Sequence, residues 1–211
     1  MIFEDLEEYI LSHIDEEGDT LAALNRDAHV NLLRPRMLSG HLQGRILKMF
    51  CRMLRPKCIL EIGTYTAYAS LSMAEALDVG AEIHTIEVND ELEDFIRKHI
   101  NRSVHGSKLH LHIGEAEKII PQLDMEFDLV FIDADKRSYC SYYTLVFDKL
   151  KSGGLIIADN TLWDGKVLLG ASSTDQQTMG IKAFNDMLVL DKRIEKVIIP
   201  IRDGLTLIWK K

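Results

Sequence analysis

The stretch Phe127-Asp-Leu-Val-Phe-Ile-Asp-Ala-Asp-Lys136 decides the fold, because an apolar run of strand length ends abruptly in charged side chains. A second stretch, Leu155-Ile-Ile-Ala-Asp-Asn-Thr-Leu-Trp163, has the same form. Such runs are typical of central strands in a parallel sheet, which are buried on both faces. Ligands bind these sheets in the crevice outside the carboxyl ends of the strands. The two stretches therefore predict a parallel sheet with a ligand site where the strands end.

Strand and helix patterns alternate on both sides of these two stretches. Three further segments are candidates for parallel strands, and Asp203-Gly204 separates two runs that predict an antiparallel hairpin. Apolar residues at helical spacing predict helices between the strands. The expected strands are 58–62, 82–87, 109–113, 127–133, 155–158, 196–201 and 205–210, and the expected helices are 2–16, 20–30, 41–54, 67–78, 90–102, 115–121 and 138–150. Residues 164–177 are expected to form a loop over the site. The alternation indicates an α/β fold, doubly wound and mostly parallel, with helices on both faces.

Composition narrows the class of protein. A length of 211 residues predicts one domain, residues 1–211, whose N-terminal helices within 1–36 are candidates for homodimer contacts or a lid over the substrate. The net charge of -8 disfavours a large basic surface for nucleic acid. No apolar run approaches the roughly 18 residues of a membrane span, and the acidic start is unlike a signal peptide. Cys51, Cys58 and Cys140 form no spaced pair, so we expect reduced thiols in a cytoplasmic protein.

Acidic and amide side chains follow both central strands. The ends of neighbouring parallel strands lie side by side, so Asp133, Asp159 and Asn160 are expected around one point, with Lys136 close by. This oxygen-only ligand set suits Mg²⁺, or another hard divalent cation such as Ca²⁺ or Mn²⁺, rather than zinc. A lysine beside such a cation has its charged form disfavoured and can act as a base. Alternatively, the aspartates cap helices and Lys136 is a solvated surface charge.

A second signal lies where the first strand runs into a turn, at Ile59-Leu-Glu-Ile-Gly63-Thr-Tyr65. Gly63 allows a sharp turn close to a ligand, and Glu87 ends the next strand, where an acidic side chain can bind a ribose. The turn lacks the G-x-G-x-x-G of pyrophosphate sites, which favours an adenosine cofactor without a diphosphate over a purely structural turn. His110 and His112 alternate on one strand face without a third ligand and are not expected to hold a metal.

Six motifs occur together in one order along the chain. They are Leu60-Glu-Ile-Gly-Thr-Tyr65, Ile86-Glu-Val-Asn89, Gly114-Glu-Ala-Glu-Lys-Ile-Ile-Pro121, the stretches 127–136 and 159–163, and Asp203-Gly-Leu-Thr206. Their joint occurrence resembles the cation-dependent class I O-methyltransferases, which include the caffeoyl-CoA and catechol enzymes and their small bacterial relatives. The resemblance covers roughly residues 30–211. It implies a Rossmann-like seven-stranded sheet with a C-terminal antiparallel hairpin, S-adenosylmethionine as methyl donor, and a divalent cation, usually Mg²⁺.

The resemblance also implies roles for individual residues. Asp133, Asp159 and Asn160 would hold the cation, and Lys136 would be catalytic together with Asp133. The donor would be held by residues from five segments: Met37, Ser39, Glu61, Gly63, Tyr65, Glu87, Gly114, Glu115, Ala116 and Asp133. Trp163 is a candidate for the acceptor pocket, and Thr206 occupies the position at which animal catechol enzymes carry a glutamate.

The implied reaction is methyl transfer to a phenolic or catechol-type hydroxyl of a small molecule. A metal-bound oxyanion attacks the sulfonium methyl, and Lys136 acts as the base. Ala67 stands where the family usually has glycine; its added methyl group can crowd the cofactor, whereas a helical position tolerates alanine well. One alternative is the same chemistry on a hydroxylated uridine of tRNA, and another is a non-catalytic cofactor-binding module. Candidate phosphate contacts for the tRNA alternative are Arg34, Arg36, Arg45, Arg52, Arg55, Lys57 and Arg137.

Overall fold

The computed structural model describes the backbone of residues 2–169 and 174–211, with side chains from residue 6 onward. Within these ranges the chain forms a seven-stranded sheet with the order β3-β2-β1-β4-β5-β7-β6. Strands β1 to β5 run parallel, and β7 lies antiparallel between β5 and β6. The strands are β1 (Cys58–Ile62), β2 (Glu82–Glu87), β3 (Leu109–Ile113), β4 (Phe127–Ile132), β5 (Leu150–Asp159), β6 (Ile194–Ile199) and β7 (Leu205–Lys210). The predicted doubly wound sheet and its closing hairpin are confirmed.

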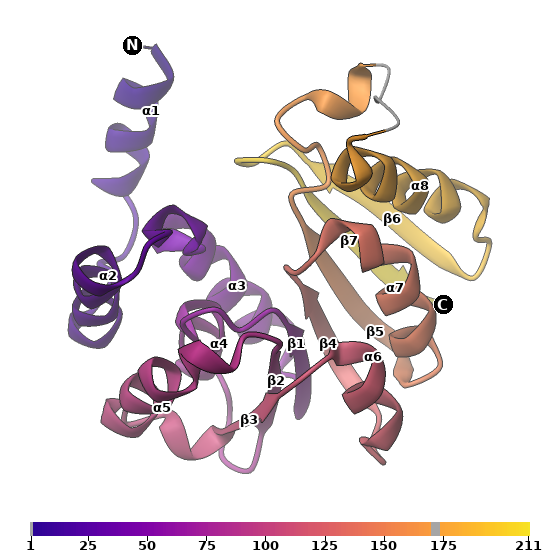
Figure 1. The fold of residues 1–211 in the computed structure, drawn as a ribbon. Helices are drawn as coiled ribbons and strands as arrows, with labels where there is room; N and C mark the ends of the chain where they lie inside the picture. Colours follow the sequence, from indigo (N-terminus) through magenta and orange to yellow (C-terminus); the bar gives the residue numbers. More distant parts are fainter. Residues whose placement is uncertain (1, 170–173) are drawn as a thin grey trace.

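Helices cover both faces of the sheet (Figure 1). One core lies under α2, α3, α4 and α5, and the other lies under α6, α7 and α8. The helices are α1 (Ile2–Leu11), α2 (Asp19–Asn31), α3 (Gly40–Leu54), α4 (Tyr68–Ala74), α5 (Glu93–Arg102), α6 (Ala116–Ile119), α7 (Tyr139–Phe147) and α8 (Gln176–Leu190). In Figure 1, α1 extends away from the sheet. No helix in the described ranges is both long and apolar enough to cross a membrane.

Alternation along the central strands explains why there are two cores. Ile59 and Phe131 point into the core under α3 and α4, whereas Leu60 and Val130 point into the core under α7 and α8. Successive side chains of a strand point to opposite faces, so a strand covered on both sides is mostly apolar at successive positions. This burial on both faces explains the apolar runs in the sequence of the central strands.

Several predicted elements have other bounds in the structure, such as α1, which ends at Leu11 instead of residue 16, and β6, which spans residues 194–199 instead of 196–201. The differences that matter for the site lie in β5 and in the segment after it. Strand β5 begins at Leu150 instead of residue 155, with a register shift opposite β4 at the Gly153-Gly154 pair that interrupts the apolar run. Helix α8 lies partly in the predicted loop 164–177 and was not predicted. The other described residues of that loop include a 3-10 turn, Lys166–Leu168, whereas residues 170–173 lie outside the described residues.

The order of the strands creates a switch point in the sheet. Strand β1 lies between β2 and β4, so the chain winds outward from β1 in one direction and then from β4 in the other. A crevice opens at the carboxyl ends of the strands on either side of such a reversal. The motifs of the sequence lie after β1, β2, β3, β4 and β5, at this end of the sheet.

Candidate active site

A cavity of about 970 Å³ opens at the carboxyl ends of the parallel strands. Its volume lies near the upper end of the range for small-molecule sites, so it can hold a nucleoside-sized molecule and a second ligand. Thirteen of the fifteen predicted site residues line it: Met37, Ser39, Gly63, Tyr65, Glu87, Gly114, Glu115, Ala116, Asp133, Lys136, Asp159, Asn160 and Trp163. The described residues that line the cavity do not include Glu61 and Thr206.

The ends of β4 and β5 bring carboxylate and amide oxygens into the cavity. Asp159 is buried, and its carboxylate accepts hydrogen bonds from the backbone N–H of Asn160 at 2.8 Å and from Nε2 of Gln43 at 2.6 Å. Burial, followed by the negative charge of Asp133, raises the pKa of Asp159 to about 6. Asn160 adopts a left-handed backbone conformation with φ of 56°, which turns the chain sharply after the strand. The site therefore concentrates negative charge.

Lys136 is buried beside these carboxylates and begins a 3-10 turn, Lys136–Ser138. Its Nζ donates to Oδ1 of Asp133 at 3.0 Å and to the hydroxyl of Tyr139 at 2.8 Å. The Tyr139 hydroxyl in turn donates to the carbonyl of Asp159 at 2.9 Å. The Trp163 ring centroid lies 5.9 Å from the same Nζ. Lys136 is thus fixed in position at the cavity, and the solvated surface charge that the sequence left open is excluded.

The turn after β1 is tied to the end of β2. Glu87 accepts hydrogen bonds from the backbone N–H of Tyr65 at 2.7 Å and of Asn89 at 2.9 Å. Gly63 has φ of +99°, and a Cβ there would lie 2.0 Å from the carbonyl oxygen of Asp133. The glycine is therefore required by the approach of the β4 backbone, and not only by space for a ligand as the sequence suggested. This contact couples the two halves of the cavity.

Two predicted site residues lie behind the cavity wall. Glu61 is fully buried and accepts hydrogen bonds from the hydroxyls of Ser70 and Thr85, while its Oε1 has no partner among the described residues. Burial raises the pKa of Glu61 to about 7. Thr206 is buried on β7 and donates to Oγ1 of Thr161 at 2.7 Å. Neither side chain is among the described residues that line the cavity, and their predicted ligand contacts stay predictions.

The remaining lining residues come from opposite sides of the cavity. Gly114, Glu115 and Ala116 follow β3, and Met37 and Ser39 lie in and just after the 3-10 turn Pro35–Met37. The guanidinium of Arg202 donates to the carbonyl of Ser39, which fixes this segment against the hairpin turn. Residues far apart in the sequence therefore enclose the cavity from both sides.

Ala67 differs from the expectation. It is fully buried in the core and is not among the described residues that line the cavity, so its methyl group does not crowd a ligand there. The residue precedes α4 with φ of 67°, instead of occupying a helical position. Glycine adopts such a left-handed conformation more readily than alanine does.

Sequence reasoning missed several residues that hold the site together. Gln43 links Asp159 to Arg202: its Nε2 donates to Asp159, and its Oε1 accepts a hydrogen bond from the Arg202 guanidinium at 2.5 Å. Gln177 on α8 accepts a hydrogen bond from the backbone N–H of Lys136 at 3.0 Å. Neither glutamine belongs to a strand end or motif. Tyr139 lies three residues after Lys136, the last residue of the motif 127–136. This spacing is the only sequence signal that could have indicated a role for Tyr139.

Comparisons with known proteins agree on one family. A family model described as O-methyltransferase matches residues 12–211. A catechol O-methyltransferase of Niastella koreensis is 34% identical over 203 residues, which cover 94% of this chain and 90% of the relative. Caffeoyl-CoA O-methyltransferase 2 of Eucalyptus globulus is 31% identical over 176 residues, which cover 78% of this chain and 71% of the relative.

Solved structures resemble the whole chain. A SAH-bound methyltransferase of Podospora anserina has a TM-score of 0.91 at 26% identity, with 100% of this chain and 95% of that chain covered. The O-methyltransferase TomG of Streptomyces achromogenes, solved in complex with SAM, has a TM-score of 0.91 at 25% identity, with 98% and 96% covered.

Proposed function

The chain belongs to the O-methyltransferase family, and from this premise we propose that it methylates a phenolic or catechol-type hydroxyl of a small molecule in a cation-dependent reaction. The methyl donor in this proposal is S-adenosylmethionine. One observation carries the proposal: Nζ of Lys136 lies 3.0 Å from Oδ1 of Asp133 in a cavity that Asp159 and Asn160 also line. This arrangement places a base beside a set of hard oxygen ligands.

The part of the cavity at β1, β2 and β3 fits the donor. The carboxylate of Glu87 lines the cavity and accepts a hydrogen bond from the backbone N–H of Tyr65, which holds the turn. From this position it is suited to accept further hydrogen bonds from ribose hydroxyls. Gly114 has φ of +143° and lines the cavity with Ala116, so little side-chain volume stands there. We assign this part to the adenosine moiety, and the part near Asp133 to the methionine moiety.

The donor set near β4 and β5 fits a divalent cation. The negative charge of Asp133 contributes, after burial, to the raised pKa of Asp159. A bound cation between the two carboxylates would relieve this repulsion. With Asn160, they would hold Mg²⁺, Ca²⁺ or Mn²⁺ through oxygen alone. The cation, when bound, supplies Lewis acidity that lowers the pKa of the acceptor hydroxyl.

Lys136 would move the proton in this reaction. Neutral Nζ accepts the hydroxyl proton of the acceptor as the new carbon–oxygen bond forms and the carbon–sulfur bond of the donor breaks. The products are the methyl ether, S-adenosylhomocysteine and protonated Lys136, so charge balances. Asp133 and Tyr139 then hold the ammonium group through the contacts at 3.0 and 2.8 Å. The buried side chain also limits access of water to the reacting atoms.

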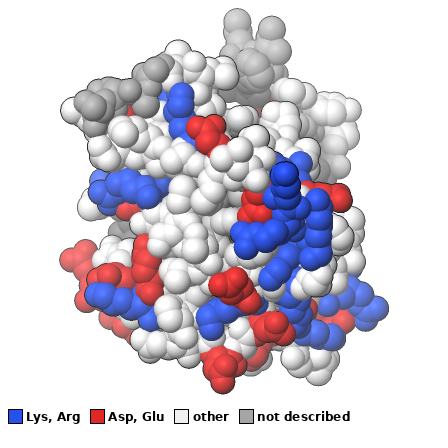
Figure 2. Space-filling model, turned by 90° about the vertical axis from the view of Figure 1, so that its right-hand side faces the viewer, with Lys and Arg blue, Asp and Glu red and all other residues white. Residues whose placement is uncertain are grey.

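A small acceptor is favoured over tRNA by the pairing of the basic residues. Arg45, Arg55, Lys57 and Arg137, four of the candidate phosphate contacts, form ion pairs with Glu75, Asp78 or Asp135. On the face that Figure 2 displays, Asp and Glu lie beside most Lys and Arg, and the largest group of Lys and Arg lies toward the right. Arg34 and Arg36 line the cavity, where positive charge suits an acceptor that carries a carboxylate.

We also propose that the chain forms a homodimer through its N-terminal helices. Helix α1 extends away from the sheet (Figure 1), and Met49 and Met53 leave 56% and 64% of their surface exposed on one face of α3. Light scattering across a range of protein concentrations tests this point, and a monomer at all concentrations would contradict it.

Methyl transfer from labelled S-adenosylmethionine to catechols and hydroxycinnamates tests the function. We expect transfer with Mg²⁺, its loss with EDTA, and its return with excess Mg²⁺. The Asp159→Ala variant should remain inactive at any Mg²⁺ concentration while it stays folded. Transfer that persists in EDTA would overturn the cation requirement. Donor binding without transfer to any of these acceptors, together with methylation of undermodified tRNA, would overturn the small acceptor.

A further inference from the structure

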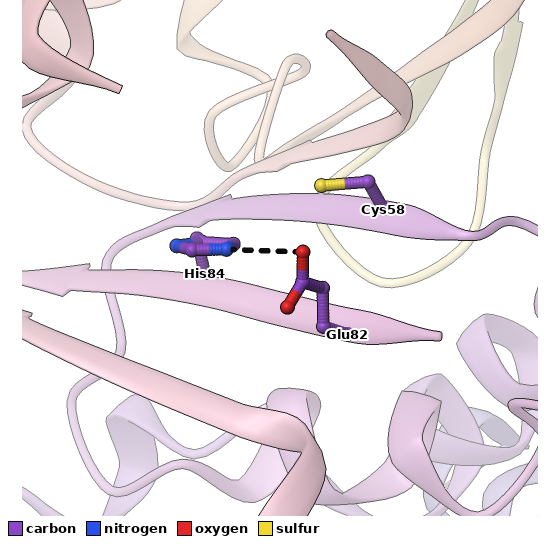
Figure 3. Close-up of side chains that lie close together, drawn as sticks. All are labelled: Cys58, Glu82 and His84. Carbon is purple, nitrogen blue, oxygen red and sulfur yellow. Dashed lines mark ion pairs between the residues drawn. The ribbon is translucent and has the colours of Figure 1, made fainter. Parts of the chain in front are cut away.

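A second group of metal-binding side chains lies away from the cavity, toward the amino-terminal ends of β1 and β2. Cys58 and Glu82 are the first residues of these two strands and lie opposite each other, and His84 follows on the same face of β2. The thiol sulfur, a Glu82 oxygen and a His84 nitrogen all lie within 4.8 Å of one another. Figure 3 shows the three side chains gathered across the two strands.

Of the three side chains, His84 gives the clearest indication of a bound ligand. It is only 7% exposed, yet its Nε2 has no hydrogen-bond partner among the described residues. Oε1 of Glu82 lies 3.7 Å from this nitrogen, too far for a hydrogen bond. Leaving a buried polar atom without a partner costs about 1–3 kcal/mol, so such atoms in a folded protein call for an explanation.

Two neighbouring histidines hold the group in place. Nδ1 of His84 lies 3.0 Å from Nε2 of His112, so a proton on Nδ1 can be donated to His112 while Nε2 presents a lone pair. His110 stacks on His84 with ring centroids 4.7 Å apart, and its Nε2 lies 3.0 Å from Oε2 of Glu82. Histidines that bind metals commonly donate their second ring N–H in this way, which fixes the orientation of the ring.

We propose that Cys58, Glu82 and His84 form a second metal site, which binds a transition-metal dication of the zinc type. A thiolate, an imidazole and a carboxylate match the ligands that Zn²⁺ takes in proteins, unlike the oxygen-only set of the cavity. Thiolate and carboxylate together carry two negative charges, which balance the ion, and the thiol proton is released to solvent on binding.

The geometry requires only a small movement. Zinc–ligand bonds of roughly 2.0–2.3 Å place tetrahedral ligand atoms about 3.5 Å apart. The separations, which all lie within 4.8 Å, must therefore shorten by at most about 1.3 Å, and the half-exposed Glu82 side chain has room to rotate. A fourth position is open to water. The ion would tie the start of β1 to β2, so its expected role is structural.

Equilibrium dialysis of the full chain against Zn²⁺ in excess Mg²⁺ tests the proposal. We expect about one tightly bound Zn²⁺ per chain, which persists in Asp159→Asn because the cavity is not involved. Cys58→Ser should weaken binding at least about tenfold, whereas the control Cys140→Ser, at a half-buried thiol on α7, should leave it unchanged. Loss of Zn²⁺ in Asp159→Asn but not in Cys58→Ser would assign the ion to the cavity and overturn the proposal.

A second variant keeps the test decisive if Cys58→Ser does not fold. Glu82→Gln alters a half-exposed side chain, so the fold should survive and Zn²⁺ affinity should fall at least about tenfold. Replacement of Zn²⁺ by Co²⁺ gives a direct readout, since a cobalt–thiolate bond adds a charge-transfer absorption band. The wild-type protein should show this band. Its absence, or equal Zn²⁺ binding by the wild type and Glu82→Gln, would refute the site.

Discussion

At the scale of single residues, the proposed chemistry depends on Lys136 more than on any other side chain. Replacing it with methionine preserves most of the buried volume but removes the base, so we expect kcat to fall by about 10²–10⁴. The affinity for S-adenosylhomocysteine should change little, because the adenosine part of the cavity lies at β1 to β3. Single-turnover methyl transfer and calorimetry measure the two quantities. Lys192→Met, at an exposed lysine, is the control, and near-normal turnover of Lys136→Met would refute the base.

Gln43 should act by positioning Asp159. Its Nε2 donates to Oδ2 of Asp159 at 2.6 Å, and it is itself held by Arg202. Gln43→Met removes this donor without adding charge, so the Mg²⁺ concentration for half-maximal activity should rise by roughly 10–100-fold. Donor affinity should stay constant. Gln122→Met, on the surface, serves as the control, and an unchanged Mg²⁺ requirement would show that Gln43 is only structural.

The sequence allowed prediction of the residues at the strand ends but not of those that support them. Asp133, Lys136, Asp159 and Asn160 follow apolar runs directly, and topology alone brings such ends together. Gln43 lies in the middle of α3, and its approach to Asp159 depends on how that helix packs. The partner of a polar residue inside an amphipathic helix is set by tertiary packing, so periodicity could not reveal it.

At the scale of elements, α8 is the largest correction, and it contacts the site. Its apolar stripe of Ile181, Phe184 and Leu188 is preceded by Gln176-Gln-Thr-Met-Gly180, whose polar and glycine residues weakened the helical pattern. The glycine has a packing reason, because a Cβ at Gly180 would lie 2.4 Å from the carbonyl oxygen of Lys136. Helix α8 can approach the turn Lys136–Ser138 only because this position lacks a side chain.

Gly180→Ala tests this approach. In a free helix the change would stabilise by about 1 kcal/mol, but the clash with the Lys136 carbonyl should produce a net loss of about 1–3 kcal/mol. Because the displaced turn carries Lys136, kcat should fall as well. Urea unfolding and methyl-transfer rates measure both effects, with Asp186→Ala on the exposed face of α8 as the control. A variant more stable than the wild type would contradict the close packing.

The contact between α2 and α5 predicts a pH dependence of stability. Asp27 on α2 accepts hydrogen bonds from Nζ of Lys98 at 2.6 Å and Nε2 of His99 at 2.7 Å on α5. The Lys98 hydrogen bond is the main cause that lowers the pKa of Asp27 from 3.8 to about 2. Because the folded-state pKa is the lower one, the stabilisation is present above about pH 4 and is lost as pH falls toward 2.

Asp27→Asn should therefore lower the free energy of unfolding by about 1 kcal/mol at pH 7, a value reduced for partial solvent exposure. At pH 3 the difference between wild type and variant should narrow to about half. Urea unfolding at the two pH values measures it, with the exposed Asp186→Asn as the control. A difference that stays constant between pH 7 and pH 3 would exclude the ionised carboxylate as its source.

At the scale of the whole molecule, the cavity joins parts of the chain that are distant in sequence. Residues from Arg34 to Asp203 line it, and the close approach of Gly63 to the Asp133 backbone connects its two halves. The order of elements could be predicted from the sequence because strand–helix alternation permits few topologies. The volume and enclosure of the cavity could not, since they depend on the packing of segments from opposite ends of the chain, such as Met37 to Ser39 before α3 and Gln177 on α8.

A ligand that needs both halves of this cavity binds the folded chain and not the unfolded one, so it must stabilise the whole molecule. At 100 times its Kd, S-adenosylhomocysteine should raise the free energy of unfolding by about 2.7 kcal/mol. Glu87→Gln should weaken binding and reduce this gain at the same ligand concentration, whereas the exposed control Glu91→Gln should not. Urea unfolding with and without the ligand measures the effect. An equal gain in Glu87→Gln and wild type would place the ligand away from Glu87 and contradict the assignment of the adenosine part of the cavity.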